Sequence, residues 1–159
     1  LVPQVAQAVR IPVIAAGGIA TGAQMLAAMA LGAEGVQIGT LFAATSESSA
    51  HDTFKQLNVD AGDGGTVLTM KKAAPVRLLR TPFTLRAMEA EAAGADKDEQ
   101  LALLGHKREM RGMFEGDIEE GEFEAGQSSA LVRDVAPAAE VLARLLDEYA
   151  RAKEVLCAT

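Results

Sequence analysis

Two glycine-bearing segments, each at the end of a short apolar run, carry the residues best suited to chemistry. Gly17 and Gly18 follow the run 11–16, and residues 37–40 end a second run that begins at Gly35. Glycine lets the backbone approach a ligand closely, and a helix that starts after such a loop presents unpaired N–H groups with partial positive charge. We therefore predict that phosphate is bound by Gly17, Gly18, Gln37, Ile38, Gly39 and Thr40, through backbone N–H groups and the threonine hydroxyl.

Other phosphate-binding loops do not occur in this sequence. It has no Gly-x-x-x-x-Gly-Lys-Ser/Thr loop and no Gly-x-Gly-x-x-Gly after a strand, which disfavours nucleoside triphosphate hydrolysis and a Rossmann cofactor site. Gly17 and Gly18 could alone form a tight turn, and Gly39 could serve packing. The repetition of the loop in two successive units favours a ligand site instead.

The segments around the two loops alternate between helical and strand patterns. Residues 2–10 have helical spacing, and 11–16 form a continuous apolar run typical of strands buried on both faces. A capping box at Thr21 predicts a helix that Gly32 closes, and residues 35–40 form a second strand. The order helix, strand, helix, strand predicts consecutive parallel βα units, with both loops at the edge where barrel active sites lie.

Beyond Thr40 the pattern becomes less regular. Residues 41–61 predict one or two helices, 66–70 an extended segment, and the acidic stretch 115–124 a solvated loop.

Three further positions predict helix starts. A helix begins at Thr81 or Thr84, another follows the Asp96-x-x-Glu99 pattern, and Pro137 suits the first position of the last helix. The last helix should bury one apolar face formed by Val141, Leu142, Leu145, Leu146 and Tyr149.

Composition narrows the class of protein. The 159 residues carry a net charge of −7, which disfavours binding to nucleic acid or an anionic membrane and favours a small-molecule substrate. The single cysteine, Cys157, excludes an internal disulfide and a multi-cysteine metal site, and it fits a reducing, cytoplasmic setting. No secretory-signal pattern or membrane-length apolar stretch is present, and the missing initiator methionine leads us to expect an upstream portion.

Several segments together resemble a known enzyme family. Residues 11–22 and 31–42 are similar to the nitronate monooxygenase (2-nitropropane dioxygenase) family and to the related flavin-type enoyl-acyl carrier protein reductases. The resemblance continues through residues 47–55, 114–121 and 125–127 and so covers most of the chain.

This resemblance implies an α/β fold that is the C-terminal part of a (β/α)₈ TIM-type barrel with a helical C-terminal extension. Residues 1–61 would be the last βα units of an FMN-binding barrel, and residues 62–159 would pack back on it. Gly17 and Gly18 match the family's phosphate loop, and residues 37–40 match its second cofactor-binding segment. The family's histidine near the flavin lies upstream of this chain, so no catalytic residue is assigned.

The activity implied is FMN-dependent oxidation of alkyl nitronates with O₂. One alternative is a flavin-dependent enoyl-acyl carrier protein reductase with a nicotinamide donor. Another is a non-catalytic phosphate-binding or structural fragment, which could associate as a homo-oligomer because unclosed strands expose edges.

Other polar residues have less specific roles. Gln127 is a weaker candidate contact to the flavin, and an equally good turn residue. His51 is expected to hydrogen-bond structurally, and His106 to be exposed to solvent. A surface patch is expected from Lys71, Lys72, Arg77 and Arg80, although these residues could also meet a phosphate-bearing cosubstrate.

Overall fold

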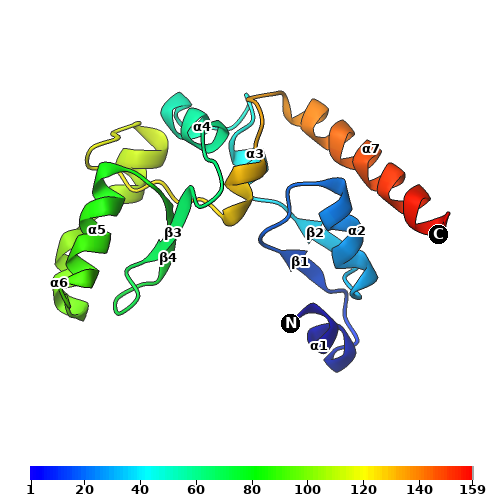
Figure 1. Ribbon diagram of the computed structural model, residues 1–159, viewed down its shortest axis with the longest axis horizontal. Helices are drawn as coiled ribbons and strands as arrows, with labels where there is room; N and C mark the ends of the chain where they lie inside the picture. The colour runs from blue at the N-terminus through cyan, green and yellow to red at the C-terminus, as the bar shows by residue number, and fades with distance from the viewer. Residues whose placement is uncertain (159) are drawn as a thin grey trace.

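The fold contains two separate pairs of strands, as a computed structural model that describes residues 1–158 shows (Figure 1). β1 (Ile14–Ala16) and β2 (Gly35–Gln37) are parallel, whereas β3 (Thr66–Thr69) and β4 (Val76–Leu79) form an antiparallel hairpin. The two pairs lie apart, with a short helix, α3 (Thr40–Ala43), between them. The fold class is therefore α/β, as predicted.

A helix connects the parallel strands. α2 (Gly22–Ala30) begins with the predicted capping box, in which Thr21 Oγ1 accepts from the backbone N–H of Gln24 at 3.2 Å and Gln24 Oε1 accepts from that of Thr21 at 3.1 Å. Ala16 is the register partner of Gln37, so the two strands end level with each other. This is the predicted βαβ arrangement.

Both parallel strands are shorter than predicted. The first begins at Ile14 instead of residue 11, in keeping with a proline at position 12, which has no N–H to donate to a ladder. The second ends at Gln37 because the chain turns at Gly39 into the next helix.

Two helices occupy the segment after the second strand. α3 (Thr40–Ala43) is a single turn, and α4 (Asp52–Val59) follows it. His51 is the N-cap of α4, and its Nδ1 accepts from the backbone N–H of Thr53 at 3.1 Å. The structural role expected for His51 is confirmed.

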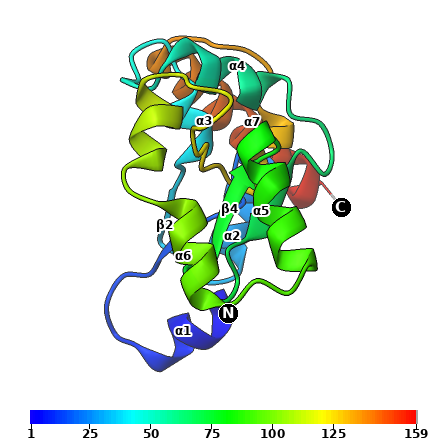
Figure 2. The same cartoon turned by 90° about the vertical axis from the view of Figure 1, so that its left-hand side faces the viewer.

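The hairpin leads into two helices that lie side by side (Figure 2). α5 (Pro82–Ala92) starts after Thr81, whose hydroxyl accepts from the backbone N–H of Thr84, so Thr81 is the cap. α6 (Lys97–Leu104) follows a second capping box, formed by Asp96 and the glutamate three residues later. Both predicted starts are confirmed.

Separate apolar clusters hold the hairpin and its helices. Phe54 and Phe123 lie in one cluster with their rings stacked 6.5 Å apart between centroids. Met70, Leu78 and Phe83 are fully buried in a second cluster beside the hairpin. These clusters join α4 and the hairpin to the segment that follows α6.

The last helix covers the parallel unit. α7 (Ala138–Cys157) packs along α2, and α1 (Val2–Ala8) lies at the opposite end of the chain (Figure 1). A Cβ at Gly22 would overlap the backbone of α7, so only glycine allows the two helices to approach this closely. Pro137 is the N-cap of α7 and not its first helical residue.

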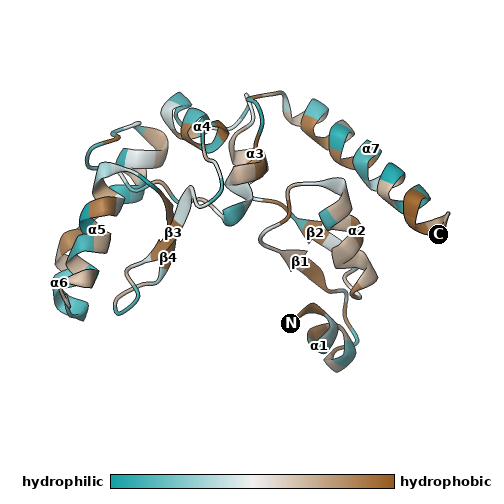
Figure 3. Cartoon of the chain, viewed as in Figure 1, coloured by the Kyte–Doolittle hydropathy of each residue, from teal (hydrophilic) through white to brown (hydrophobic). Residues whose placement is uncertain are grey.

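The apolar face of α7 is narrower than predicted. Val141 and Leu145 are buried, but Leu142 and Leu146 are each 50% exposed. The exposed pair lies one position further around the helix, outside the stripe that α2 and α3 cover. Figure 3 accordingly shows hydrophobic and hydrophilic patches alternating along α7. Within the described residues, none of the helices has the length and hydropathy required of a membrane span.

The sequence predicted a solvated loop for the acidic stretch 115–124, but much of it is packed against other parts of the chain. It lies between a π-helical turn (Met110–Phe114) and a 3₁₀ turn (Gln127–Leu131). Arg108 Nη1 donates to both the carbonyl and a carboxylate oxygen of Glu120, at 2.6 and 2.9 Å. Glu122 is only 4% exposed. Tertiary contacts therefore hold much of this stretch in place.

The carboxyl of Glu122 is a weaker acid than that of an ordinary glutamate. Burial, and to a lesser degree the nearby carboxylates of Glu124 and Glu109, raise the pKa of its carboxyl to about 7, although Arg108 opposes them. At a pH below 4.5, the ordinary pKa of glutamate, the Glu122 carboxyl is protonated in both the folded and the unfolded chain. Between pH 4.5 and about 7 only the unfolded chain loses this proton, so the folded state loses stability over that range and the loss is complete once the pH has passed about 7.

We predict that Glu122→Gln removes this pH dependence. The amide stays neutral, so the variant should be more stable than the parent near pH 8 by up to about 3 kcal/mol and should differ little near pH 5. Urea unfolding at both pH values measures the difference. Glu119→Gln, at an exposed position in the same stretch, is the control. A variant at Glu122 that follows the parent at both pH values would contradict the assignment.

Candidate functional site

The two glycine loops lie next to each other at one edge of the parallel sheet. Because Ala16 and Gln37 are register partners, the chain leaves both strands at the same level. Gly17 and Gly18 have φ angles of +93° and +70°, a region that favours glycine. A Cβ built on either residue, or on Gly39, would meet no described atom within 4 Å. Both loops therefore face open space that a ligand could enter.

The helix after the first loop has few free donors, contrary to expectation. Gln24 Oε1 accepts from the backbone N–H groups of Ala20 and Thr21 at 2.8 and 3.1 Å. The N–H of Gly22 donates to Glu148 Oε2 of α7 at 2.9 Å. Side chains of the protein itself thus occupy the start of α2.

The second loop has the free donors that the first helix lacks. Gly39 is the N-cap of α3, and within the described residues no acceptor is found for the backbone N–H groups of Thr40, Leu41 and Phe42. Gln37 is exposed, whereas the side chain of Ile38 packs against two apolar clusters. Ile38 could therefore contact a ligand only through its backbone.

The C-terminal part of the chain returns to this loop. The backbone N–H of Gly126 donates to Thr40 Oγ1 at 3.0 Å. Gln127, the weaker candidate, instead lines a different cavity beside residues 62–66. The contact to Thr40 is made by Gly126. This residue belongs to the part of the chain, residues 62–159, that was expected to pack back on the barrel, but it was not predicted as a site residue.

A cavity of about 510 Å³ opens between the second loop and the hairpin. Gly39 and Thr40 form part of one wall and Arg77 of β4 part of another. Apolar side chains complete much of the lining, namely those of Ala43, Phe54, Val76, Met113 and Ala125. A volume in this range, with apolar walls and a few polar groups, is typical of a small-molecule site.

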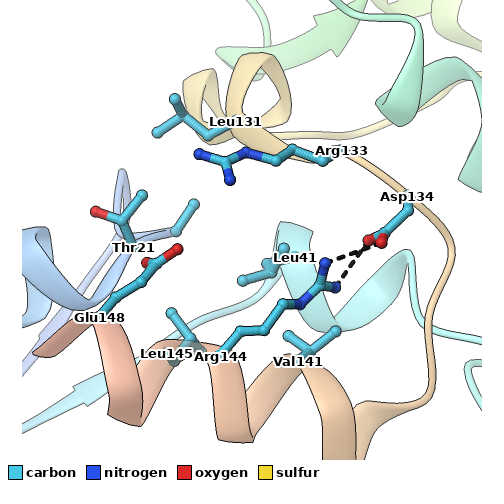
Figure 4. Close-up of a pocket in the computed structure, with 10 residues that line it drawn as sticks. Thr21, Leu41, Leu131, Arg133, Asp134, Val141, Arg144, Leu145 and Glu148 are labelled. Carbon is cyan, nitrogen blue, oxygen red and sulfur yellow. Dashed lines mark hydrogen bonds and ion pairs between the residues drawn. The ribbon is translucent and has the colours of Figure 1, made fainter.

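A second, much smaller cavity lies behind the loops, between the start of α2 and α7 (Figure 4). Its volume is about 40 Å³, and Arg144 reaches across it to bind both carboxylate oxygens of Asp134 at 2.8 and 2.7 Å. The hydrogen bonds from Arg144 hold the pKa of Asp134 below its ordinary value. Arg144 and Asp134 neutralise each other, so this ion pair serves mainly to hold α7 in place.

The remaining polar residues lie outside the site. His106 is exposed, as predicted, and so are Lys71, Lys72 and Arg80. Arg77 departs from that expected surface patch because it is half-buried and lines the larger cavity.

Comparison with known proteins gives a consistent set of relatives. The family profile described as nitronate monooxygenase matches residues 1–148. A "Probable nitronate monooxygenase" of Staphylococcus saprophyticus is 34% identical over 134 residues, which are 84% of this chain and 38% of that sequence.

Solved structures agree in fold. FabK from Thermotoga maritima is 40% identical, with a TM-score of 0.90 over 99% of this chain and 50% of that chain. Nitroalkane oxidase from Streptomyces ansochromogenes is 35% identical, with a TM-score of 0.76 over 98% of this chain and 44% of that chain. The chain thus spans about half the length of these solved relatives.

We predict that Thr40→Val loosens the attachment of the C-terminal part to the second loop. Valine cannot accept from the backbone N–H of Gly126, and leaving this partly buried donor unpaired costs at most about 1–3 kcal/mol. Urea unfolding should show this loss, whereas Thr40→Ser, which keeps the hydroxyl, should stay close to the parent. Equal stability of the valine and serine variants would show that the hydrogen bond contributes nothing.

Proposed function

This chain belongs to the nitronate monooxygenase family, and from that membership we propose that it supplies the phosphate-binding end of an FMN-dependent enzyme that oxidises alkyl nitronates with O₂. The observation that carries the proposal is the pair of adjacent loops, one with two glycines at positive φ and one leading into the free donors of α3. Phosphate at a helix N-terminus is a recurrent way of holding such a cofactor.

The residues present fit a bound phosphate. Gly17, Gly18 and Gly39 have no side chain, and a Cβ built on any of them would meet no described atom within 4 Å, so the backbone can approach the phosphate oxygens closely. The Thr40 hydroxyl accepts from Gly126 and keeps its own proton available to donate. Gln37 lies exposed at the same strand end, within the second loop. When FMN is bound, its isoalloxazine supplies the electron chemistry, and this chain supplies binding and orientation.

The proposed architecture is a (β/α)₈ barrel to which β1, α2 and β2 contribute late units. Residues 1–61 would belong to the barrel and residues 62–159 to the extension, and the rest of the barrel would come from the part of the relatives' length that this chain does not span. The hydrogen bond between Thr40 and Gly126 supports an extension that packs back on the cofactor face. A single cysteine suits a cytoplasmic enzyme.

Enoyl thioester reduction is the second candidate, because FabK, at 40% identity and a TM-score of 0.90, is more similar to this chain than the nitroalkane oxidase, at 35% and 0.76. The phosphate loops would serve either reaction. Oxidation of NADH that depends on an enoyl thioester would favour the reductase, and O₂ consumption that depends on a nitronate would favour the monooxygenase. A chain that binds no flavin would instead support a non-catalytic fragment.

We predict that Gly39→Val weakens FMN binding by at least about tenfold, or about 1.4 kcal/mol. The backbone φ of −89° accommodates valine, so the variant should fold, but its side chain would fill the space in front of the α3 donors. Flavin fluorescence during FMN titration measures the affinity. Gly18→Val should act in the same direction and also strain the backbone, because φ is +70° there.

Gly62→Val provides the matched control. Its Cβ would also meet no described atom within 4 Å, but the residue lies in a different cavity. Unchanged FMN affinity in a folded Gly39→Val protein would remove the site assignment. Absence of FMN binding in the parent protein would overturn the flavin proposal itself.

A further inference from the structure

One arginine in this structure is both partly buried and without a carboxylate partner. Five others make ion pairs with carboxylates: Arg86, Arg108, Arg111, Arg144 and Arg151. Among the described arginines that lack such a pair, Arg10, Arg80 and Arg133 are exposed, whereas Arg77 is half-buried. A cation withdrawn from water is costly unless an anion accompanies it, so Arg77 calls for an explanation.

Arg77 lies at the wall of the large cavity. It shares a face of β4 with Leu79, which packs against Phe54, and both Arg77 and Phe54 line the cavity. Its Nη1 donates to the carbonyl and hydroxyl of Thr66 at 3.3 and 3.2 Å. In the described part of the chain, no acceptor contacts its Nε or Nη2. The guanidinium is thus anchored at one nitrogen and has donors left over.

The one acidic residue lining the cavity does not neutralise this charge. Glu124 follows Phe123 on the segment that bridges to Leu78, and among the described residues it makes no ion pair with Arg77. Burial raises the pKa of Glu124, and the Glu109 carboxylate raises it further, so Glu124 keeps its proton to a higher pH than an ordinary glutamate. Near Glu124, the carboxyl of Glu122 interacts electrostatically with Arg108 as well as with the carboxylates of Glu124 and Glu109.

We propose that Arg77 is the substrate-positioning residue of this cavity and that it binds planar anions with two oxygens on one trigonal atom. This inference rests on the proposed function and deepens it. A nitronate and a carboxylate both have that shape, which the planar guanidinium fork can meet with two parallel hydrogen bonds. A neutral enoyl thioester has no such group, so Arg77 favours the nitronate over the alternative substrate.

The location of the cavity supports this role. Gly39 and Thr40, which belong to the proposed phosphate site, line the same open cavity as Arg77, so a small anion bound by Arg77 would lie near that site. The apolar side chains around Arg77 lower the local dielectric, which strengthens its attraction for an anion. The volume of about 510 Å³ is sufficient for a short alkyl nitronate.

Two measurements test the proposal. In the first, ¹³C-labelled acetate is titrated into the protein with and without FMN and followed by NMR. In the second, the Michaelis constants for propane 2-nitronate and neutral 2-nitropropane are compared in the FMN-loaded protein. We expect Arg77→Met to weaken acetate binding and to raise the KM for the nitronate by about 10–100-fold, the value of one charge-assisted hydrogen-bonded contact. The KM for 2-nitropropane should change less than about twofold, since that substrate carries no charge to pair.

Two further variants separate recognition from folding. Arg77→Lys keeps the charge but loses the fork, and should fall between the parent and the methionine variant. Arg80→Met, at an exposed position where Nε donates only to the Gly64 carbonyl at 2.9 Å, should bind acetate like the parent.

The outcomes distinguish this inference from the proposed function. Acetate binding does not need the flavin, so its loss in Arg77→Met supports the subsite even if the parent protein binds no FMN. The inference is overturned if the parent binds no acetate, if Arg77→Met binds it as well as the parent, or if the variant loses neutral 2-nitropropane as severely as the nitronate.

Discussion

The parallel register between β1 and β2 is the constraint on which the candidate site depends. With Ala16 opposite Gln37, two loops that are separated in sequence by the whole of α2 leave the sheet at one level. A slip of one residue would turn the side chains of the shifted strand to the opposite face and would displace one loop from the other by about 3.3 Å. The short ladder therefore needs support from outside the sheet, and the helices that pack against it provide that support.

The packing of α7 determines which helix end is available to a ligand. Glu148 of α7 binds the backbone at Gly22, and Gln24 satisfies the two preceding N–H groups. An anion at the start of α2 would have to compete with these acceptors, whereas the first turn of α3 has no internal competitor in the described residues. The contact that holds α7 therefore favours the first turn of α3, after Gly39, as the place for the proposed anion site.

Features set by neighbouring residues could be predicted from the sequence. The capping boxes at Thr21 and Asp96 depend on residues three positions apart, and the two glycine loops on the residues that precede them. Contacts between distant segments could not be predicted in this way. Glu122 belongs to an acidic stretch typical of solvated surface, yet tertiary packing buries it, and no local signal pairs Gly126 with Thr40 across 86 positions.

The proposed phosphate site and the cavity wall that carries Arg77 come from different parts of the chain. This separation offers a reason why FabK and a nitroalkane oxidase can share this fold. The proposed phosphate site is formed by the loops after β1 and β2, but the wall that carries Arg77 comes from the hairpin and the segment that returns beside it. On this proposal, changes in the hairpin would alter which substrate is bound without disturbing the loops. Because fold does not determine reaction, the proposed selectivity for a nitronate would reside in this wall and not in the proposed phosphate loops. The half-buried, unpaired guanidinium is the feature of that wall that a neutral substrate would leave unsatisfied.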